Sequence, residues 1–188
     1  SIDTRNAKTM RAALDAGANI INDISALTHD PESVSIAAAA DVPVILMHMQ
    51  GTPQTMQDNP IYNNVVEDVF GWLKGRIQYC ETHRLPMKNV VLDPGLGFGK
   101  TLEDNLLILR NITKFSDLEC PILLGSSRKS FIAKVSNDEP PEQRLAGSLS
   151  SVLWGLSQGV NFFRVHDVPE TIQAIKVYRA IADAKSDS

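Results

Sequence analysis

Six short apolar runs recur along this chain, and nearly all of them end on a polar or charged residue. The runs cover residues 1–4, 18–24, 43–48, 90–93, 121–126 and 160–166. Continuous apolar runs of this length are typical of strands that are buried on both faces, as the strands of parallel sheets are. The pattern therefore predicts six parallel strands.

Helical patterns fill the gaps between these runs. They predict helices over residues 4–17, 30–40, 63–83, 101–111, 145–156 and from 169 onward, with a loop over residues 50–62. Thr4 and Asp30 are the expected N-caps of the first two helices. Apolar stripes predict the inward faces of the last two helices, at Leu145, Leu149, Val152, Leu153 and Leu156 and at Ile172, Ile175, Tyr178 and Ile181. Strict alternation of strands and helices indicates right-handed crossovers within one domain over residues 1–188.

The polar residues at the ends of the runs indicate where a site lies. In a (β/α) barrel, functional residues sit at the carboxyl ends of the strands. Here these ends carry Asp3, Asn22, His48, Asp93, Ser127 with Lys129, and Arg164 with His166. A (β/α)8 barrel typically needs ~250 residues, whereas this chain has 188 residues and six strand candidates. The sequence therefore predicts an α/β fold of the (β/α)8 TIM-barrel type that lacks the first two βα units.

Composition narrows the classes of function. The net charge is −4, acidic and basic residues are mixed, and no basic tract indicates nucleic-acid binding. No stretch approaches the ~18 consecutive apolar residues of a membrane span. The two cysteines have no metal-like spacing. We expect a soluble, cytoplasmic protein that has neither a nucleic acid nor a membrane as its partner.

The sharpest local motif is DPGLGFGKT, over residues 93–101. A phosphate-binding P-loop needs glycine where Pro94 stands, and a dinucleotide-binding motif needs glycine where Lys100 stands. What remains is a strand that ends in the carboxylate of Asp93, followed by three glycines that let the backbone approach a ligand closely. The alternative is that Asp93 only caps the turn before the proline.

A second motif, RVHD over residues 164–167, places Arg164 and His166 on one side of a strand. A guanidinium fork and an imidazole that point the same way suit a phosphate or a diphosphate. The competing interpretation is a structural pair between Arg164 and Asp167. We expect the two cationic side chains to project together, opposite the strand end that carries Asp93.

Three further positions have open interpretations. Arg128 and Lys129 are neighbours after the fifth run and cannot both face one point, so one binds a ligand and the other pairs elsewhere; a solvated basic turn is the alternative. Asn22 is flanked by apolar residues and needs hydrogen-bond partners, which either the backbone or a ligand can supply. His48, between two methionines, is expected to be a structural histidine with its hydrogen bonds satisfied.

These motifs together resemble one known family. SIDT, IINDI, LMHMQGTP, LDPGLGFGK, GSSRKS and RVHDV occur here in the order found in bacterial dihydropteroate synthase, and they extend from end to end of the chain. The resemblance implies a transferase of folate synthesis on a (β/α)8 barrel, of the kind that sulfonamides target. Such an enzyme joins 6-hydroxymethyl-7,8-dihydropterin diphosphate to 4-aminobenzoate and releases pyrophosphate.

The resemblance also implies roles for individual residues. The positions that match pterin-binding residues are Asp3, Asn22, Met47, Asp93, Phe98, Gly125 and Lys129. The positions that match the 4-aminobenzoate pocket are Phe98, Ser127 and Lys129. Arg164 and His166 match the diphosphate-binding pair, and with Lys129 they are the catalytic candidates. A homodimer is implied as well.

The chain departs from the family at its beginning. The family's first strand, whose asparagine binds magnesium, and its second strand with the loop that follows are not among the motifs found. A Mg²⁺ cofactor is therefore implied by the resemblance, with its ligand expected outside this chain, and the activity of this chain by itself stays open. Two other functions also stay open. One is a pterin-binding methyltransferase domain, against which the basic motifs argue, and the other is a truncated barrel that binds pterin without turnover.

Overall fold

At least one helix follows each strand in the computed structural model, which describes residues 1–56 and 58–184, and two α-helices lie between the fifth and the sixth strand. The strands are β1 (Ile2–Asp3), β2 (Ile21–Asp23), β3 (Val44–Met47), β4 (Val90–Asp93), β5 (Leu123–Leu124) and β6 (Phe162–Phe163). The α-helices are α1 (Ala7–Asp15), α2 (Ser33–Ala40), α3 (Val65–Thr82), α4 (Leu102–Arg110), α5 (Ser130–Val135), α6 (Leu145–Ser157) and α7 (Val168–Ala182). Residue 57 of the predicted loop and residues 185–188 of the predicted domain lie outside the described residues. None of the helices in the described part is long and apolar enough to cross a membrane.

The strands lie side by side in chain order, and every pair is parallel. β1 to β4 form one hydrogen-bonded sheet, β5 pairs with β6, and a bridge between Leu92 and Ile122 joins the two sets. The six predicted strands are confirmed; β4 has the bounds of its apolar run, and the other five strands are shorter than theirs. Within residues 1–56 and 58–184, β1 pairs only with β2 and β6 only with β5. The strands thus form an arc of an incomplete (β/α) barrel.

The two faces of this arc have different environments. Side chains alternate between the faces of a strand. One set, which includes Val44, Leu46, Val90 and Leu92, packs under the helices in the main core, and a smaller cluster is formed by Ile45, Val91 and Leu123. The register pairs Asp3 with Asn22 and Met47 with Asp93. Because of this register, polar residues from several strands meet at the carboxyl end of the sheet.

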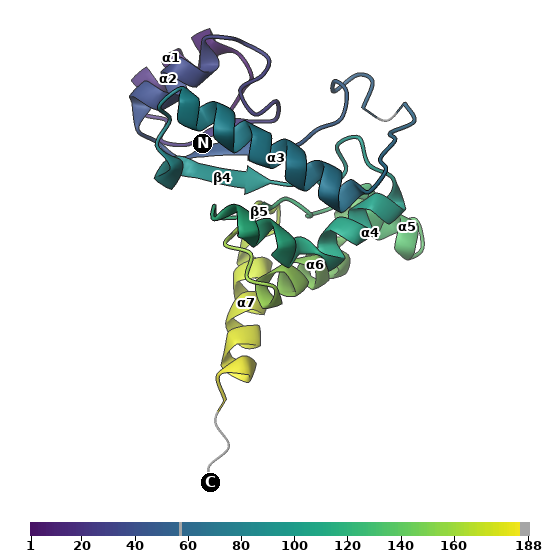
Figure 1. Ribbon diagram of the computed structural model, residues 1–188. Coiled ribbons are helices and arrows are strands. Elements are labelled where there is room, and N and C mark those ends of the chain that lie inside the picture. Colours follow the sequence, from purple (N-terminus) through teal and green to yellow (C-terminus); the bar gives the residue numbers. More distant parts are fainter. Residues whose placement is uncertain (57, 185–188) are drawn as a thin grey trace.

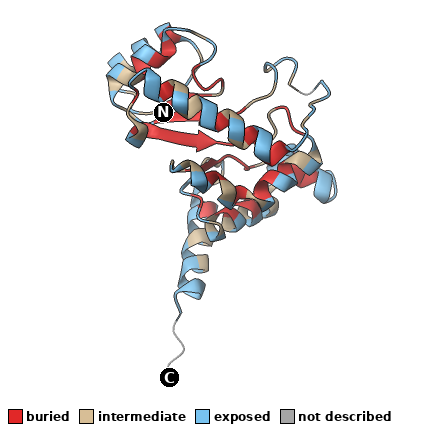
Figure 2. Cartoon of the chain, viewed as in Figure 1, coloured by how far each residue is buried: buried red, intermediate tan, exposed pale blue. Residues whose placement is uncertain are grey.

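The C-terminal helix is the least covered element. In Figure 1, α7 projects from the rest of the molecule. Figure 2 shows that β4 is buried, whereas α7 is largely exposed. Thr171 is its only buried residue. Ile172 is 48% and Ile181 is 72% exposed, so the prediction that both face inward is wrong. The physical reason is that α7 packs along the leucine stripe of α6 in an open groove, which Ile181 lines without being covered and to which Ile172 does not contribute.

The first two helices begin differently from the prediction. Asn6 and not Thr4 stands at the N-cap of α1, and the Thr4 Oγ1 accepts a hydrogen bond from the Asn6 N–H at 3.1 Å. The carboxylate of Asp30 accepts a hydrogen bond from the Ala7 N–H at 2.9 Å, so it caps α1 from a distant part of the chain. α2 itself begins only at Ser33. Asp30 therefore joins the starts of two neighbouring helices.

The loop after β4 lies against the backbone of the loop after β3, and glycine makes this approach possible. Gly95 has φ +72°, and a Cβ there would lie 1.9 Å from the carbonyl oxygen of His48.

Gly17 has φ +96° with open space around it. We expect Gly17→Ala to lower the free energy of unfolding by about 1–2 kcal/mol through its dihedral angle alone. Gly95→Ala should lower it by at least about 2 kcal/mol more, because the backbone must move. Urea unfolding followed by circular dichroism measures both, and equal losses would contradict the close approach.

Candidate active site

Residues at the ends of four strands, β1, β2, β4 and β6, form one hydrogen-bonded network. The Asn22 Nδ2 donates to the Asp3 Oδ2 at 3.0 Å. The Arg164 guanidinium donates from Nη1 to the Asn22 Oδ1 at 3.2 Å and from Nη2 to the Asp93 Oδ2 at 3.0 Å. The partners of the Asn22 side chain here are the side chains of Asp3 and Arg164, so its hydrogen bonds are satisfied by neither of the two partners that the sequence suggested. Four of the predicted site residues meet at one place.

Asp93 is the buried centre of this network. It is 1% exposed, and its Oδ1 accepts a hydrogen bond from the Gly95 N–H at 2.7 Å, while its Oδ2 receives Arg164. The turn-capping role and the role in a site thus occur together, one on each oxygen. A buried carboxylate needs such partners, since an unpaired charge in a protein interior is costly.

Arg164 was expected opposite Asp93, and that expectation is wrong, because the two form an ion pair. The physical reason lies at Gly125. A Cβ on Gly125 would lie 2.8 Å from the Arg164 Nη2, so only a residue without a side chain leaves room for the guanidinium in this position. The Arg164 side chain is 40% exposed, whereas that of Asp93 is 2% exposed. The guanidinium therefore lies between the buried carboxylate and solvent.

Lys129 and Phe98 form the neighbouring part of the site. The Lys129 Nζ lies 4.2 Å from the centre of the Phe98 ring, a cation–π distance. Burial lowers the pKa of Lys129, while the charge of Asp93 acts in the opposite direction and Arg164 adds to the lowering. A lysine and an aromatic wall thus stand beside the carboxylate.

The two basic neighbours after β5 face different points, as predicted. Arg128 forms a bidentate pair with Asp167, with its Nε 3.1 Å from the Asp167 Oδ2. Lys129 faces Phe98. Asp167 pairs with Arg128, so the proposed structural pair between Arg164 and Asp167 is wrong.

His166 lies at the exposed rim of the site. Its backbone N–H donates to the Ser127 Oγ at 3.2 Å, and its Nδ1 lies 3.0 Å from the same oxygen. Ser127 is 5% exposed and so ties His166 to the end of β5. Arg164 and His166 leave the same strand end but have different partners in this structure.

Lys100 was not predicted as a functional residue, and the structure places it between the loops that follow β3 and β4. Lys100 is 4% exposed, and its Nζ lies 2.9 Å from the His48 Nδ1 and donates to the carbonyl oxygens of Gly95 at 2.9 Å and Phe98 at 3.1 Å. Burial lowers the pKa of His48 to about 3, so its ring is neutral at pH 7 and accepts this hydrogen bond. The structural role predicted for His48 is confirmed. Lysine is usually exposed, and the only signal for Lys100 was its place inside a glycine-rich motif.

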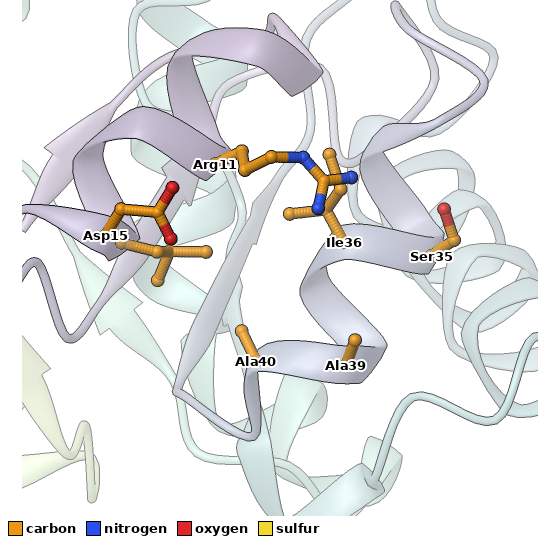
Figure 3. Close-up of a pocket in the computed structure, with 7 residues that line it drawn as sticks. Arg11, Asp15, Ser35, Ile36, Ala39 and Ala40 are labelled. Carbon is orange, nitrogen blue, oxygen red and sulfur yellow. The ribbon is translucent and has the colours of Figure 1, made fainter.

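A pocket outside this network holds none of the predicted site residues (Figure 3). It lies between α1 and α2, and is lined by Arg11, Leu14, Asp15, Ser35, Ile36, Ala39 and Ala40. Its charged groups are one guanidinium and one carboxylate. The network at the strand ends is the stronger candidate for chemistry.

The family model described as "Pterin binding enzyme" matches residues 1–166. The chain belongs to this family. The match includes every residue of the network at the strand ends, from Asp3 to Arg164, and ends at His166. The resemblance seen in the motifs is therefore confirmed at the level of the family.

Individual relatives agree with this assignment. The chain is 41% identical over 184 residues to the dihydropteroate synthase of Haemophilus influenzae, an alignment that covers 98% of this chain and 66% of that protein. The structure of the Stenotrophomonas maltophilia dihydropteroate synthase with imidazole in its active site matches with a TM-score of 0.94 and 39% identity, over 98% of this chain and 69% of that one. The Xanthomonas albilineans dihydropteroate synthase in complex with 7,8-dihydropteroate matches with a TM-score of 0.90 and 38% identity, over 97% and 66%.

These matches confirm the predicted fold class, since the similar structures are TIM barrels and this chain is an α/β part of one. The chain spans about two thirds of the length of the curated relatives that it matches.

Proposed function

We propose that this chain supplies most of the barrel of a dihydropteroate synthase. The reaction joins 6-hydroxymethyl-7,8-dihydropterin diphosphate to 4-aminobenzoate and releases pyrophosphate. The observation that carries the proposal is the buried carboxylate of Asp93, which shares its Oδ2 with the guanidinium of Arg164 at 3.0 Å. The ends of β4 and β6 together thus offer an acceptor for a pterin and a cation for a diphosphate.

Pterin recognition follows from the shape of this acceptor. The pterin ring presents an amino group and a ring N–H on one edge, which resembles the donor edge of a guanidinium. Arg164 now makes such a contact with the Asp93 Oδ2. A bound pterin replaces it there, and Asn22 and Asp3 add polar atoms beside it. Met47, Gly125 and Phe98 are the proposed walls of the pterin slot, and Lys129 its cationic side.

The displaced guanidinium then serves the other end of the substrate. Arg164 turns toward the diphosphate, which His166 reaches from the exposed rim. A charge-assisted bidentate contact of this kind is strong and suits diphosphate oxygens. The Asp93 carboxylate is therefore paired with Arg164 when the site is empty and with the pterin when the substrate is bound.

These groups surround the proposed transfer step. The amine nitrogen of 4-aminobenzoate, held by Phe98, Ser127 and Lys129, attacks the methylene carbon of the pterin. A C–N bond forms while the C–O bond to the diphosphate breaks, and its electron pair leaves with pyrophosphate. The amine loses one proton to solvent or to the leaving group. Arg164, His166 and Lys129 stabilise the negative charge that builds up on the diphosphate. A methyltransferase has no such leaving group and no use for these cations.

Magnesium is implied by the resemblance, which places its asparagine ligand in the family's first strand, outside this chain. Mg²⁺ prefers oxygen ligands, and the Asp3, Asn22 and Asp93 oxygens named above already accept hydrogen bonds from Asn22, Arg164 and Gly95. In residues 1–56 and 58–184 no group of three His, Cys, Asp or Glu side chains could hold a metal ion. We place its ligands outside this chain. The homodimer and the cytoplasmic location rest likewise on the resemblance and belong to the proposal.

The test uses a complete barrel, because β1 and β6 each pair on one side only within the described residues. For the test, the N-terminal segment of the Haemophilus influenzae relative is joined to the start of this chain. We call the resulting fusion protein the completed barrel. We expect it to release pyrophosphate and form 7,8-dihydropteroate in equal amounts, and only when both substrates are present. Pterin binding without either product would instead support the barrel that binds but does not turn over. A folded protein that does neither would contradict the proposal.

A further inference from the structure

We propose that Lys100 is a positioning residue of this site, which holds the loop of residues 94–99 so that Phe98 faces Lys129. The proposal rests on the proposed function, and it concerns how the site receives its aromatic substrate. Lys100 is buried, its Nζ hydrogen-bonds to His48, Gly95 and Phe98, and the proposed transfer step assigns it no part.

The loop needs such a support because it lies on another loop and not on a strand. A Cβ on Gly99 would lie 2.7 Å from the carbonyl oxygen of Gln50, and one on Gly95 would lie 1.9 Å from that of His48. The two loops therefore stack backbone against backbone. Lys100 reaches both, since its Nζ contacts the His48 ring on one loop and the carbonyl groups of Gly95 and Phe98 on its own.

One of the Lys100 contacts is with a residue of the proposed 4-aminobenzoate pocket. The carbonyl group that Lys100 holds belongs to Phe98, whose ring lies 4.2 Å from the Lys129 Nζ. A Cβ on Gly97 would lie 3.4 Å from the Lys129 Cδ, so the loop also borders the lysine stem. Movement of this loop therefore displaces the aromatic wall and alters the position of Lys129 together. Both residues belong to the proposed 4-aminobenzoate pocket.

Hydrogen-bond donation explains this role better than charge does. Three acceptors surround the Nζ, and a buried carbonyl group that loses its donor is left unsatisfied. Burial lowers the pKa of Lys100 to about 7, against the charges of Asp93 and Asp104 and with a contribution from Lys129. Tyr62 adds a second support, because its hydroxyl donates to the carbonyl oxygen of Gly99 at 2.7 Å.

The experiment compares Lys100→Met with Lys100→Gln in the completed barrel. Methionine and glutamine have the same length, one atom shorter than lysine; methionine removes every donor, whereas glutamine keeps two N–H donors without a charge. Lys114→Met is the matched control, since Lys114 is a partly exposed lysine that pairs with Glu67 away from the site. We measure the KM for 4-aminobenzoate, kcat, the melting temperature, and hydrogen exchange of a peptide that covers residues 94–101.

For Lys100→Met we expect the KM for 4-aminobenzoate to rise about tenfold, kcat to fall less, and the amides of residues 95–99 to exchange faster. Lys100→Gln should recover most of both losses, and Lys114→Met should change neither. A lower melting temperature with unchanged KM and unchanged exchange would overturn the proposal, as would a glutamine variant no better than methionine. If the parent shows no turnover while exchange still separates the variants as expected, the proposed function fails and the positioning of the loop stands.

Discussion

Asp93→Asn is expected to weaken pterin binding by the completed barrel roughly a hundredfold or more, while the protein stays folded. The substitution keeps the shape of the side chain but presents an NH2 group where the pterin edge needs an acceptor. Each buried donor left without an acceptor costs about 1–3 kcal/mol, and the pterin edge has two such donors.

The fold has reasons to tolerate this change. An asparagine at this position can still accept the hydrogen bond from the Gly95 N–H through its Oδ1. Arg164 loses its ion pair, but its side chain is 40% exposed and can turn to solvent. The loss should therefore appear in binding and much less in stability.

Asp23→Asn is the matched control, because Asp23 is also a buried carboxylate at the end of a strand. It is 0% exposed and accepts hydrogen bonds from Ser25 and Leu27 within its own loop. We expect this variant to lose stability and keep its affinity for pterin. Calorimetric titration with a bare pterin and thermal unfolding measure both effects. A dissociation constant of Asp93→Asn within twofold of the parent would refute the role of Asp93.

The convergence of the site could be predicted because it depends on a local rule. Parallel strands in chain order bring their carboxyl ends to one edge, and side chains alternate with period two. Asp3, Asn22 and Asp93 therefore had to meet if the six apolar runs were strands. The same rule predicted that Arg128 and Lys129 diverge, as they do.

Other features depend on contacts that no local pattern contains. The ion pair of Arg164 and Asp93 requires the empty space at Gly125, and the burial of Lys100 requires the loop after β3 to lie beneath it. The inward face predicted for α7 failed for Ile172 and Ile181 because periodicity shows which side of a helix is apolar, not whether anything covers that side. Covering depends on the elements that surround it in space.

Arg164→Met should separate the two halves of the substrate. Removal of a charge-assisted bidentate contact costs about 1.5–3 kcal/mol, so affinity for the pterin diphosphate should fall roughly ten- to hundredfold. Affinity for a pterin without diphosphate should stay close to that of the parent, since two effects oppose each other. The variant has no guanidinium to compete for the Asp93 Oδ2, and it also lacks the counter-charge that now stabilises this buried carboxylate.

Both ligands are titrated against the same variant of the completed barrel, and the ratio of their affinities is the quantity that decides. Arg76→Met is the control, because Arg76 is a partly buried arginine that donates to the carbonyl oxygen of Ala26, and it should leave the ratio unchanged. Equal weakening of the two ligands by Arg164→Met, or weakening of the bare pterin alone, would assign Arg164 to the pterin or to the fold. A loss confined to the diphosphate places the leaving group within reach of Arg164. Arg164 is then the partner of Asp93 only in the absence of substrate, and the pterin replaces it when the substrate binds.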